Sequence, residues 1–319
     1  MDPLDTGNGT ERVCADLNAE IARQQALGFR IELIYPADDP HSAVMSRDGE
    51  RVRLTTQPDA AAPTEQLPPF APQFMLTRAG DEGGEGRAGM LYRDLIPGRL
   101  GGRYIASHIS IPGSGPVADW AHFHHVAFQL IVVRSGWVRV VYEDQGGPFV
   151  MVAGDLVVQP PGIRHRVLES SAMLEVVEIG CPALHATFAD HDIDLPTGGF
   201  DPDRDFGGQR FLRHVATDTP WTAFGSGEAA ETEVATATEG IADVRIVRGD
   251  VSFPAHHGEL VFGFVLSGSA RLEFDGGHLL SPADALAIPP GQTWRIAAAS
   301  PDFRLLHVTT AIVAPAHSA

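Results

Sequence analysis

Hydrophobic and polar residues alternate in short runs over most of the chain, and glycine, proline or aspartate separates one run from the next. From position 103 onward these runs predict strands over 104–111, 122–125, 129–133, 138–142, 149–152, 156–159, 164–168 and 174–179. Short strands at even spacing, with little sign of helix, are typical of an antiparallel sandwich or a small barrel. We therefore expect an all-β domain in this part of the chain.

The first 85 residues follow a different pattern. Apolar residues at near-helical spacing predict a short helix over 10–28 that ends at Gly28. A strand over 30–35 and a hairpin over 43–54, turning at Asp48 and Gly49, complete a small separate layer. Stretches rich in alanine and proline (57–72) and in glycine and glutamate (80–86) are predicted connectors.

The strand pattern returns over 244–313 as an internal repeat. Residues 261–268 align with 129–136, and 283–291 align with 154–162. We divide the chain into an N-terminal extension (1–85), a first barrel (86–182), a linker (183–210) and a second barrel (211–319).

Histidines in the first barrel have the spacing of a metal site. His122 and His124 are two residues apart, so a strand would place both side chains on one face. His165 follows Pro160 and Gly162, which mark a tight turn between two strands. Imidazole nitrogen is a common metal ligand, and these three residues therefore predict one shared ion.

The joint spacing resembles the two motifs of the cupin family, G-x5-H-x-H-x3,4-E-x6-G and G-x5-P-x-G-x2-H-x3-N. The matching residues are His122, His124, Gln129 and Gly136 for the first motif, and Gly154, Pro160, Gly162 and His165 for the second. Gln129 replaces the usual glutamate, Glu169 stands where the family has asparagine, and the opening glycine is one residue out of register at Gly115.

The resemblance implies a bicupin: an all-β chain of two jelly-roll barrels in tandem, with a short α+β N-terminal extension. It implies that His122, His124, Gln129 and His165 hold a divalent metal ion. Fe(II) is the first choice for imidazole and oxygen donors, and Mn, Ni, Cu and Zn stay open. The family also leads us to expect a homodimer.

The second barrel does not repeat the ligands. Pro254 aligns with His122, Val261 with Gln129 and Trp294 with His165, which leaves His256 alone. We expect this barrel to be metal-free, although an irregular site built from His256, His257 and Glu259 stays open.

Gln129 affects the charge of the predicted site. With neutral ligands a divalent ion keeps its full charge, so anionic chelators such as enolates, catecholates, hydroxy acids or keto acids would suit it, and Gln129→Glu should weaken their binding. The resemblance implies a dioxygenase or other oxidoreductase acting on a small molecule. A metal-dependent isomerase, lyase or hydrolase and a non-catalytic ligand-binding module are the alternatives.

Other candidates surround this cluster. Strand alternation places Glu169 on the same side as His165, where it is the predicted catalytic residue, either orienting a ligand or accepting a proton. The alternative is that Glu169 faces solvent at the end of the strand. The same alternation turns Arg164 and Arg166 outward and leaves His125 in a turn. The strand before the first motif offers further residues that could reach the pocket, namely Arg103, Tyr104 and His108.

Composition excludes several classes of function. The chain of 319 residues is 44% hydrophobic, which suits two barrels and an extension. Its net charge of −18 disfavours nucleic acid and anionic membrane as partners. Cys14 and Cys181 are far apart and predict neither disulfides nor a zinc ribbon. Because the sequence shows neither a secretion signal nor a long apolar run, we expect a cytoplasmic protein.

Overall fold

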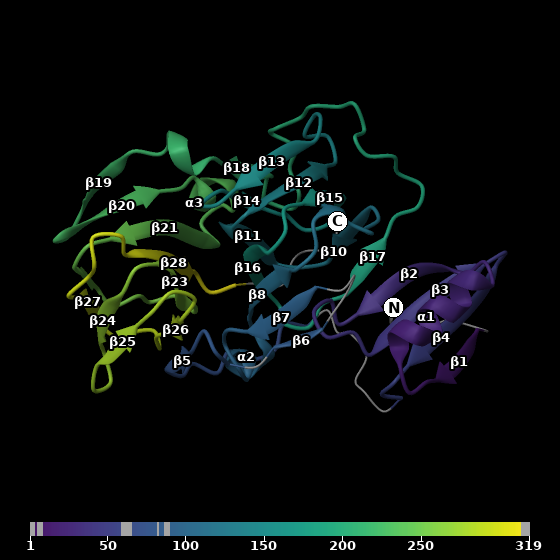
Figure 1. Cartoon of the computed structure of the whole chain (residues 1–319), viewed down its shortest axis with the longest axis horizontal. Helices are drawn as coiled ribbons and strands as arrows, with labels where there is room; N and C mark the ends of the chain where they lie inside the picture. Colours follow the sequence, from purple (N-terminus) through teal and green to yellow (C-terminus); the bar gives the residue numbers. More distant parts are fainter. Residues whose placement is uncertain (1–3, 5–8, 59–65, 82, 86–89, 314–319) are drawn as a thin grey trace.

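The computed structural model describes residue 4 and residues 9–58, 66–81, 83–85 and 90–313. In Figure 1 these residues form three units in a row: a purple N-terminal unit, a central blue and teal barrel, and a green and yellow barrel. The predicted connectors over 57–72 and 80–86 fall partly outside the described residues. Among the helices that are described, none is long and apolar enough to cross a membrane.

The N-terminal unit is one helix on a small sheet. Its elements are β1 (Thr10–Val13), α1 (Leu17–Ala26), β2 (Arg30–Tyr35), β3 (Ser42–Arg47) and β4 (Glu50–Thr55). The helix begins later than predicted, because Asp16 caps it by accepting a hydrogen bond from the backbone N–H of Ala19. The residues before the cap form β1, which pairs in parallel with β4.

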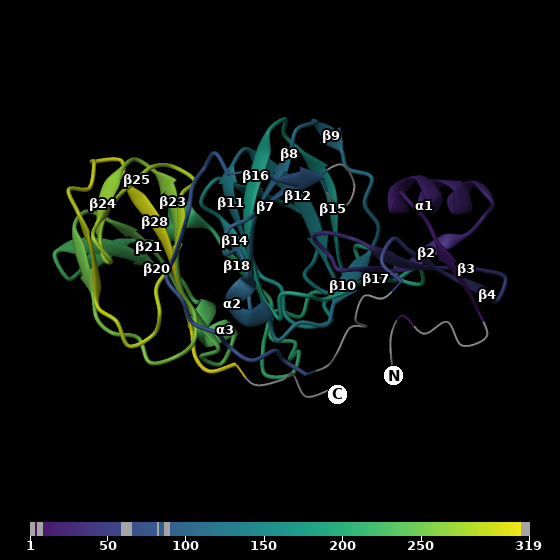
Figure 2. The same ribbon diagram turned by 90° about the horizontal axis from the view of Figure 1, so that it is seen from below.

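The first barrel consists of two facing sheets, and Figure 2 shows it as a ring seen end-on. Its elements are β6 (Gly84–Glu85), β7 (Leu91–Asp94), α2 (Arg99–Gly102), β8 (Ile105–Ile111), β9 (Gly115–Pro116), β10 (His122–His124), β11 (Phe128–Ser135), β12 (Trp137–Tyr142), β13 (Phe149–Val152), β14 (Leu156–Val158), β15 (His165–Ser170), β16 (Leu174–Cys181) and β17 (Thr187–Ala189). One sheet contains β14, β11, β16 and β8 in that order, and the other contains β17, β10, β15, β12 and β13.

The second barrel repeats this plan. The chain from residue 211 onward contains β18 (Leu212–His214), which joins the first barrel, and then η2 (Ala216–Asp218), β19 (Trp221–Phe224), β20 (Gly227–Glu231), α3 (Val234–Ala237), β21 (Ala242–Arg248), β22 (Val251–Phe253), β23 (Val261–Ser267), β24 (Ala270–Glu273), β25 (His278–Leu280), β26 (Ala285–Ala287), β27 (Trp294–Ala297) and β28 (Arg304–Thr310). The sheet β20-β21-β28-β23-β26 faces the sheet β22-β27-β24-β25. The chain is therefore all-β apart from short helices, as the repeat predicts.

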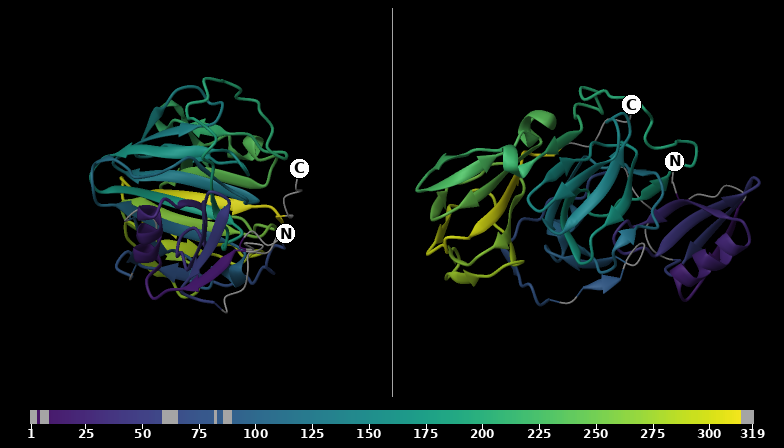
Figure 3. Two further views of the ribbon diagram at one scale, coloured as in Figure 1. Left: turned by 90° about the vertical axis from the view of Figure 1, so that its right-hand side faces the viewer. Right: turned by 45° about the horizontal axis from the view of Figure 1, so that its top comes forward.

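Each barrel receives an edge strand from a segment that the sequence assigns to another unit. The strand β5 (Met75–Thr77), predicted to lie in the N-terminal extension, pairs with β26 of the second barrel. In return β18, from the predicted second barrel, pairs with β14 of the first. Pairing of this kind covers exposed sheet edges. Figure 3 shows the two barrels packed side by side, and one apolar core contains Phe128 of the first barrel and Phe262 of the second.

The N-terminal unit is not a separate layer. Its strand β2 pairs with β17, which pairs in turn with the histidine-bearing strand β10. The sheet of the first barrel thus continues into the extension. The loop after β2 also contributes Ala37 to the wall of the cavity in the first barrel.

Candidate metal centre

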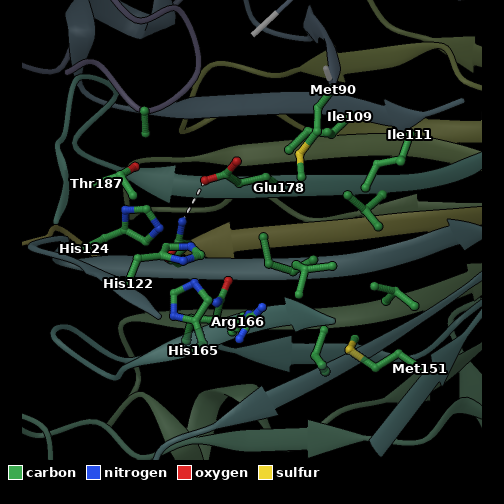
Figure 4. Close-up of a pocket in the computed structure, with 18 of the residues that line it drawn as sticks. Met90, Ile109, Ile111, His122, His124, Met151, His165, Arg166, Glu178 and Thr187 are labelled. Atoms are coloured by element: carbon green, nitrogen blue, oxygen red, sulfur yellow. Dashed lines mark hydrogen bonds between the residues drawn. The ribbon is translucent and has the colours of Figure 1, made fainter. Parts of the chain in front are cut away.

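Three histidines meet inside the first barrel. His122 and His124 lie on β10, and His165 lies opposite His122 at the start of β15. Each offers one ligand nitrogen, and these nitrogens all lie within 4.8 Å of one another. The ring centroids are 4.2 Å apart for His122 and His165, 5.4 Å for His122 and His124, and 5.5 Å for His124 and His165. Figure 4 shows the three rings at one end of a cavity.

The backbone orients all three rings. The Nδ1–H group of His122 donates to the carbonyl of Trp120 at 2.8 Å, that of His124 to Ala186 at 3.1 Å, and that of His165 to Ile163 at 3.0 Å. A carbonyl oxygen can only accept, so each Nδ1 carries the proton and each Nε2 carries the lone pair. A histidine that ligates a metal typically donates its other N–H in this manner. The donor set therefore fits a divalent metal ion.

Burial favours the neutral form of the His124 ring. The pKa of His124 is lowered well below its usual range, first by burial and then by the neighbouring rings of His185, His122 and His165. A neutral imidazole is the form that binds a metal.

Gln129 lies in the same cavity, and its amide Nε2–H group donates a hydrogen bond to Oε1 of Glu178 at 2.7 Å. Both side chains are buried. Sequence reasoning missed Glu178, although a signal exists: Leu174, Val176 and Glu178 alternate along β16 and all line the cavity. The carboxylate that is absent from position 129 is thus present on the neighbouring strand.

The structure does not bring Glu169 to the histidines. A β-bulge interrupts the alternation in β15, since Val140 pairs with Val167 but Arg139 pairs with Glu169. The extra residue reverses the faces beyond it. Glu169 therefore points away from the cavity and forms an ion pair with Arg139 at 3.2 Å, while Ser170 is buried.

Arg164 and His125 lie away from the cavity, as predicted, whereas Arg166, which was also predicted to point outward, borders it. Arg164 donates to Asp190 at 2.9 Å, and its guanidinium lies over the ring of Phe123 at 4.3 Å. His125 is exposed, with its ring against Phe188. Arg166 borders the cavity but is an exposed residue.

The candidates on β8 and just before it face the second barrel instead of the pocket. Arg103 forms a two-pronged ion pair with Glu259, with distances of 2.9 and 2.8 Å, and the Tyr104 hydroxyl donates to the same carboxylate at 2.7 Å. The His108 ring packs against Phe264, with centroids 5.8 Å apart.

Two further polar residues at the histidine end escaped sequence reasoning. Thr187 on β17 lines the cavity, is fully buried, and its hydroxyl has no hydrogen-bond partner within the described part of the chain. His185 packs edge-on against His124, and its Nε2 lies 4.0 Å from Oε1 of Glu178. No local motif marks either residue, because the pairing of β17 with β10 brings them here.

The cavity continues from the histidines into the barrel and has a volume of about 110 Å³. Its further walls are apolar and include Met90, Ile109, Ile111, Ile131, Val138, Val140, Met151, Leu174 and Val176. The space thus has a polar end and an apolar end (Figure 4).

The second barrel has an aromatic pair at the equivalent place. Phe253 pairs with Trp294 as His122 pairs with His165, and the two rings stack 3.8 Å apart. The prediction that Pro254 is equivalent to His122 is therefore wrong by one residue: Phe253 is the equivalent residue. The loops that follow the two strands differ in length, and the sequence alignment did not include this difference. His256 donates to the carbonyl of Thr310 at 2.7 Å. Across the described ranges, the cluster with metal-ligand spacing is that of His122, His124 and His165.

Comparison with known proteins identifies the fold. No family model matches the sequence, and no curated protein matches it. Among solved structures, oxalate decarboxylase from Bacillus subtilis at pH 4.6 is 13% identical, with a TM-score of 0.54 over 79% of this chain and 80% of that chain. A deletion mutant of the same enzyme is 14% identical, with a TM-score of 0.55 over 79% and 80% of the two chains. A structure from a study of the Mn(II) centres of that enzyme is 13% identical, with a TM-score of 0.54 over 81% of each chain.

Identity this low establishes the fold alone. The alignments cover 79% of this chain, which is more than either barrel alone contains, so the shared fold takes in both barrels. The chain has the bicupin fold.

Proposed function

We propose that the first barrel is a metal-dependent enzyme that acts on a small acid, and that its reaction is a non-redox lyase reaction such as a decarboxylation. The observation that carries the proposal is the set of three hydrogen bonds from Nδ1–H groups to backbone carbonyls. These bonds fix the tautomer of each ring, so that each presents the lone pair of Nε2 as a metal ligand. The structural likeness to oxalate decarboxylase supports a lyase over the dioxygenase predicted from the sequence.

His122, His124 and His165 would hold the ion. Bound there, a divalent ion would act as a Lewis acid toward an oxygen of the substrate. We propose Mn(II) ahead of Fe(II), because the similar enzyme is described as having Mn(II) centres, and both ions suit imidazole and oxygen donors.

Glu178 is the acidic residue among the side chains that line the cavity in the described ranges. When a carboxyl group leaves as CO2, the carbon that keeps the electron pair takes a proton. Glu178 would relay that proton from the solution to the carbon and return to its carboxylate form. Gln129 keeps the carboxylate in position through its amide N–H. The apolar walls exclude water from the reacting carbon.

Metal analysis with a paired assay tests the proposal. Protein stripped of metal is reloaded with Mn(II), Fe(II) or Zn(II), and small 2-oxo acids and oxalate are supplied while CO2 release and O2 uptake are both recorded. We expect CO2 release without O2 uptake. Oxygen consumed in proportion to substrate would instead establish the oxidative reaction.

Three variants separate the metal site from general effects. His165→Ala should lose bound metal and activity together, whereas His257→Ala, which changes an exposed histidine of the second barrel, should keep both. Glu178→Gln should keep the metal and lower kcat by about 100-fold or more, in the usual range for loss of a general acid or base.

A further inference from the structure

The cavity of the first barrel has two chemically distinct ends. Figure 4 shows the histidines, Thr187 and Glu178 at one end and Met90, Ile109, Ile111 and Met151 toward the other. Several apolar side chains that line it are only half-buried, among them Ile111, Ile131 and Val176. Apolar surface left open inside a barrel favours an apolar occupant.

The polar end offers a hydrogen-bond donor as well as the histidines. Thr187 Oγ1 is fully buried and has no partner among the described residues. A buried hydroxyl without a partner is destabilising, and β17 holds Thr187 opposite His124. An oxygen of a ligand bound beside the histidines would satisfy this hydroxyl.

The charges of the metal ion and of Glu178 at the polar end would together compensate one negative charge of a ligand. A divalent ion on neutral histidines brings two positive charges, and the carboxylate of Glu178 removes one. Arg166 borders the cavity but is exposed, so solvent screens its charge. A monoanion is therefore neutralised, whereas a small dianion would leave an uncompensated charge against apolar walls, which is costly.

The volume limits the size of the occupant. At about 110 Å³ the whole cavity, with its polar end included, is smaller than the apolar cavity of about 150 Å³ that binds benzene in an engineered protein. Because an acid group would already fill the polar end, the apolar end accepts a short branched chain and excludes an aromatic ring.

We propose, on the basis of the function proposed above, that the substrate is an amphipathic monoanion: an acidic oxygen group binds beside the histidines and Thr187, and a short aliphatic body of about three or four carbons lies against Ile109, Ile111 and Met151. Oxalate, which has no apolar body, is then a poor ligand of this chain.

A ligand series tests the proposal with the Mn(II)-loaded protein. Calorimetry measures Kd for oxalate, pyruvate, 2-oxobutanoate, 4-methyl-2-oxopentanoate, phenylpyruvate and indole-3-pyruvate. At about 0.8 kcal/mol per buried methylene, affinity should rise about fourfold with each carbon up to 4-methyl-2-oxopentanoate. It should fall again for the two ring compounds, and oxalate should bind at least tenfold more weakly than 4-methyl-2-oxopentanoate.

Two matched pairs of variants locate the binding mode. Met151→Phe narrows the apolar end and should weaken 4-methyl-2-oxopentanoate at least tenfold while leaving pyruvate within twofold. Val150→Phe on the same strand, where the side chain is 42% exposed, should change neither. Thr187→Val should weaken every acid about tenfold, and Thr187→Ser should restore binding.

The outcomes separate the two proposals. If metal is bound but affinity does not depend on the apolar body, or oxalate binds tightest, the substrate class is overturned while the metal-dependent function stands. If metal is bound and none of the acids binds, the substrate class is overturned as well. If no metal is bound, the proposed function is overturned and the substrate class falls with it.

Discussion

Gln129 on β11 donates a hydrogen bond of 2.7 Å to Glu178 on β16 inside the first barrel. The sequence predicts a site with neutral ligands and the full charge of the ion, because glutamine replaces the expected glutamate at position 129. The structure changes this interpretation. A carboxylate lies within one hydrogen bond of Gln129, so the net charge of the site depends on the pair.

The pair predicts the effect of exchanging the two residues. Gln129→Glu places two carboxylates in contact and removes the N–H donor, which should destabilise the metal-free protein by about 1–3 kcal/mol. The double variant Gln129→Glu with Glu178→Gln restores one donor and one acceptor, and it should recover most of the loss. Urea unfolding of the three proteins measures this, and equal stability of the single and double variants would contradict it.

Metal should stabilise the protein through the histidine cluster. Free Mn(II) at 100 times its Kd should raise the free energy of unfolding by about 2.7 kcal/mol. His165→Ala should abolish the increase, because it removes one of the clustered nitrogens. His125→Ala changes an exposed neighbour of the cluster and should keep it. Thermal unfolding with and without metal measures the difference; a gain that survives in His165→Ala would place the ion elsewhere.

His108 predicts a loss of stability in acid. Arg93 donates to its Nδ1 at 3.4 Å and its Nε2–H donates to Glu175 at 3.1 Å, an arrangement that requires the neutral ring. Burial, followed by Arg93 and Arg134, lowers the pKa of His108 to about 4. The unfolded chain, with a pKa of about 6.5, binds the proton first, so stability is lost as the pH falls from about 6.5 toward 4.

The matching variant is His108→Gln, which cannot titrate. Between pH 7 and pH 5 it should lose roughly 1–2 kcal/mol less stability than the parent chain. Urea unfolding at both pH values measures this difference. An identical pH dependence in the two proteins would show that His108 does not contribute.

The Arg103 and Glu259 pair predicts that the barrels unfold together. Both side chains are buried at the contact of the two barrels, and Tyr104 donates to the same carboxylate. Glu259→Ala leaves a buried guanidinium without its partner and should cost about 3–5 kcal/mol. Circular dichroism and tryptophan fluorescence should report one shared transition, shifted as a whole, and separate transitions for the two barrels would contradict the prediction.

Local patterns in the sequence predicted the strands, the repeat and the histidine cluster. The spacing of His122 and His124 and the turn before His165 involve residues close together along the chain. Alternation within a strand and the geometry of a tight turn decide where such residues point. For the same reason Arg164 and His125 were predicted to point away from the cluster, and they do.

Alternation fails where a distant strand alters the local geometry. The bulge in β15 forms against β12 and turns Glu169 away from the cavity, and only the pairing of β22 with β27 shows that Phe253, not Pro254, corresponds to His122. The exchange of β5 and β18 between barrels likewise depends on which sheet edges are left open.

The sequence by itself determined that two β-barrels form and that three histidines of the first meet. Only the tertiary structure decided that Glu178 and Thr187 join them and that the cavity has an apolar end. The physical reason is that alternation within a strand decides which face a side chain takes, whereas the neighbours on that face come from strands far away in the sequence. Thr187 lies beside His124, and Glu178 beside Gln129, although about 50 or more residues separate the members of each pair.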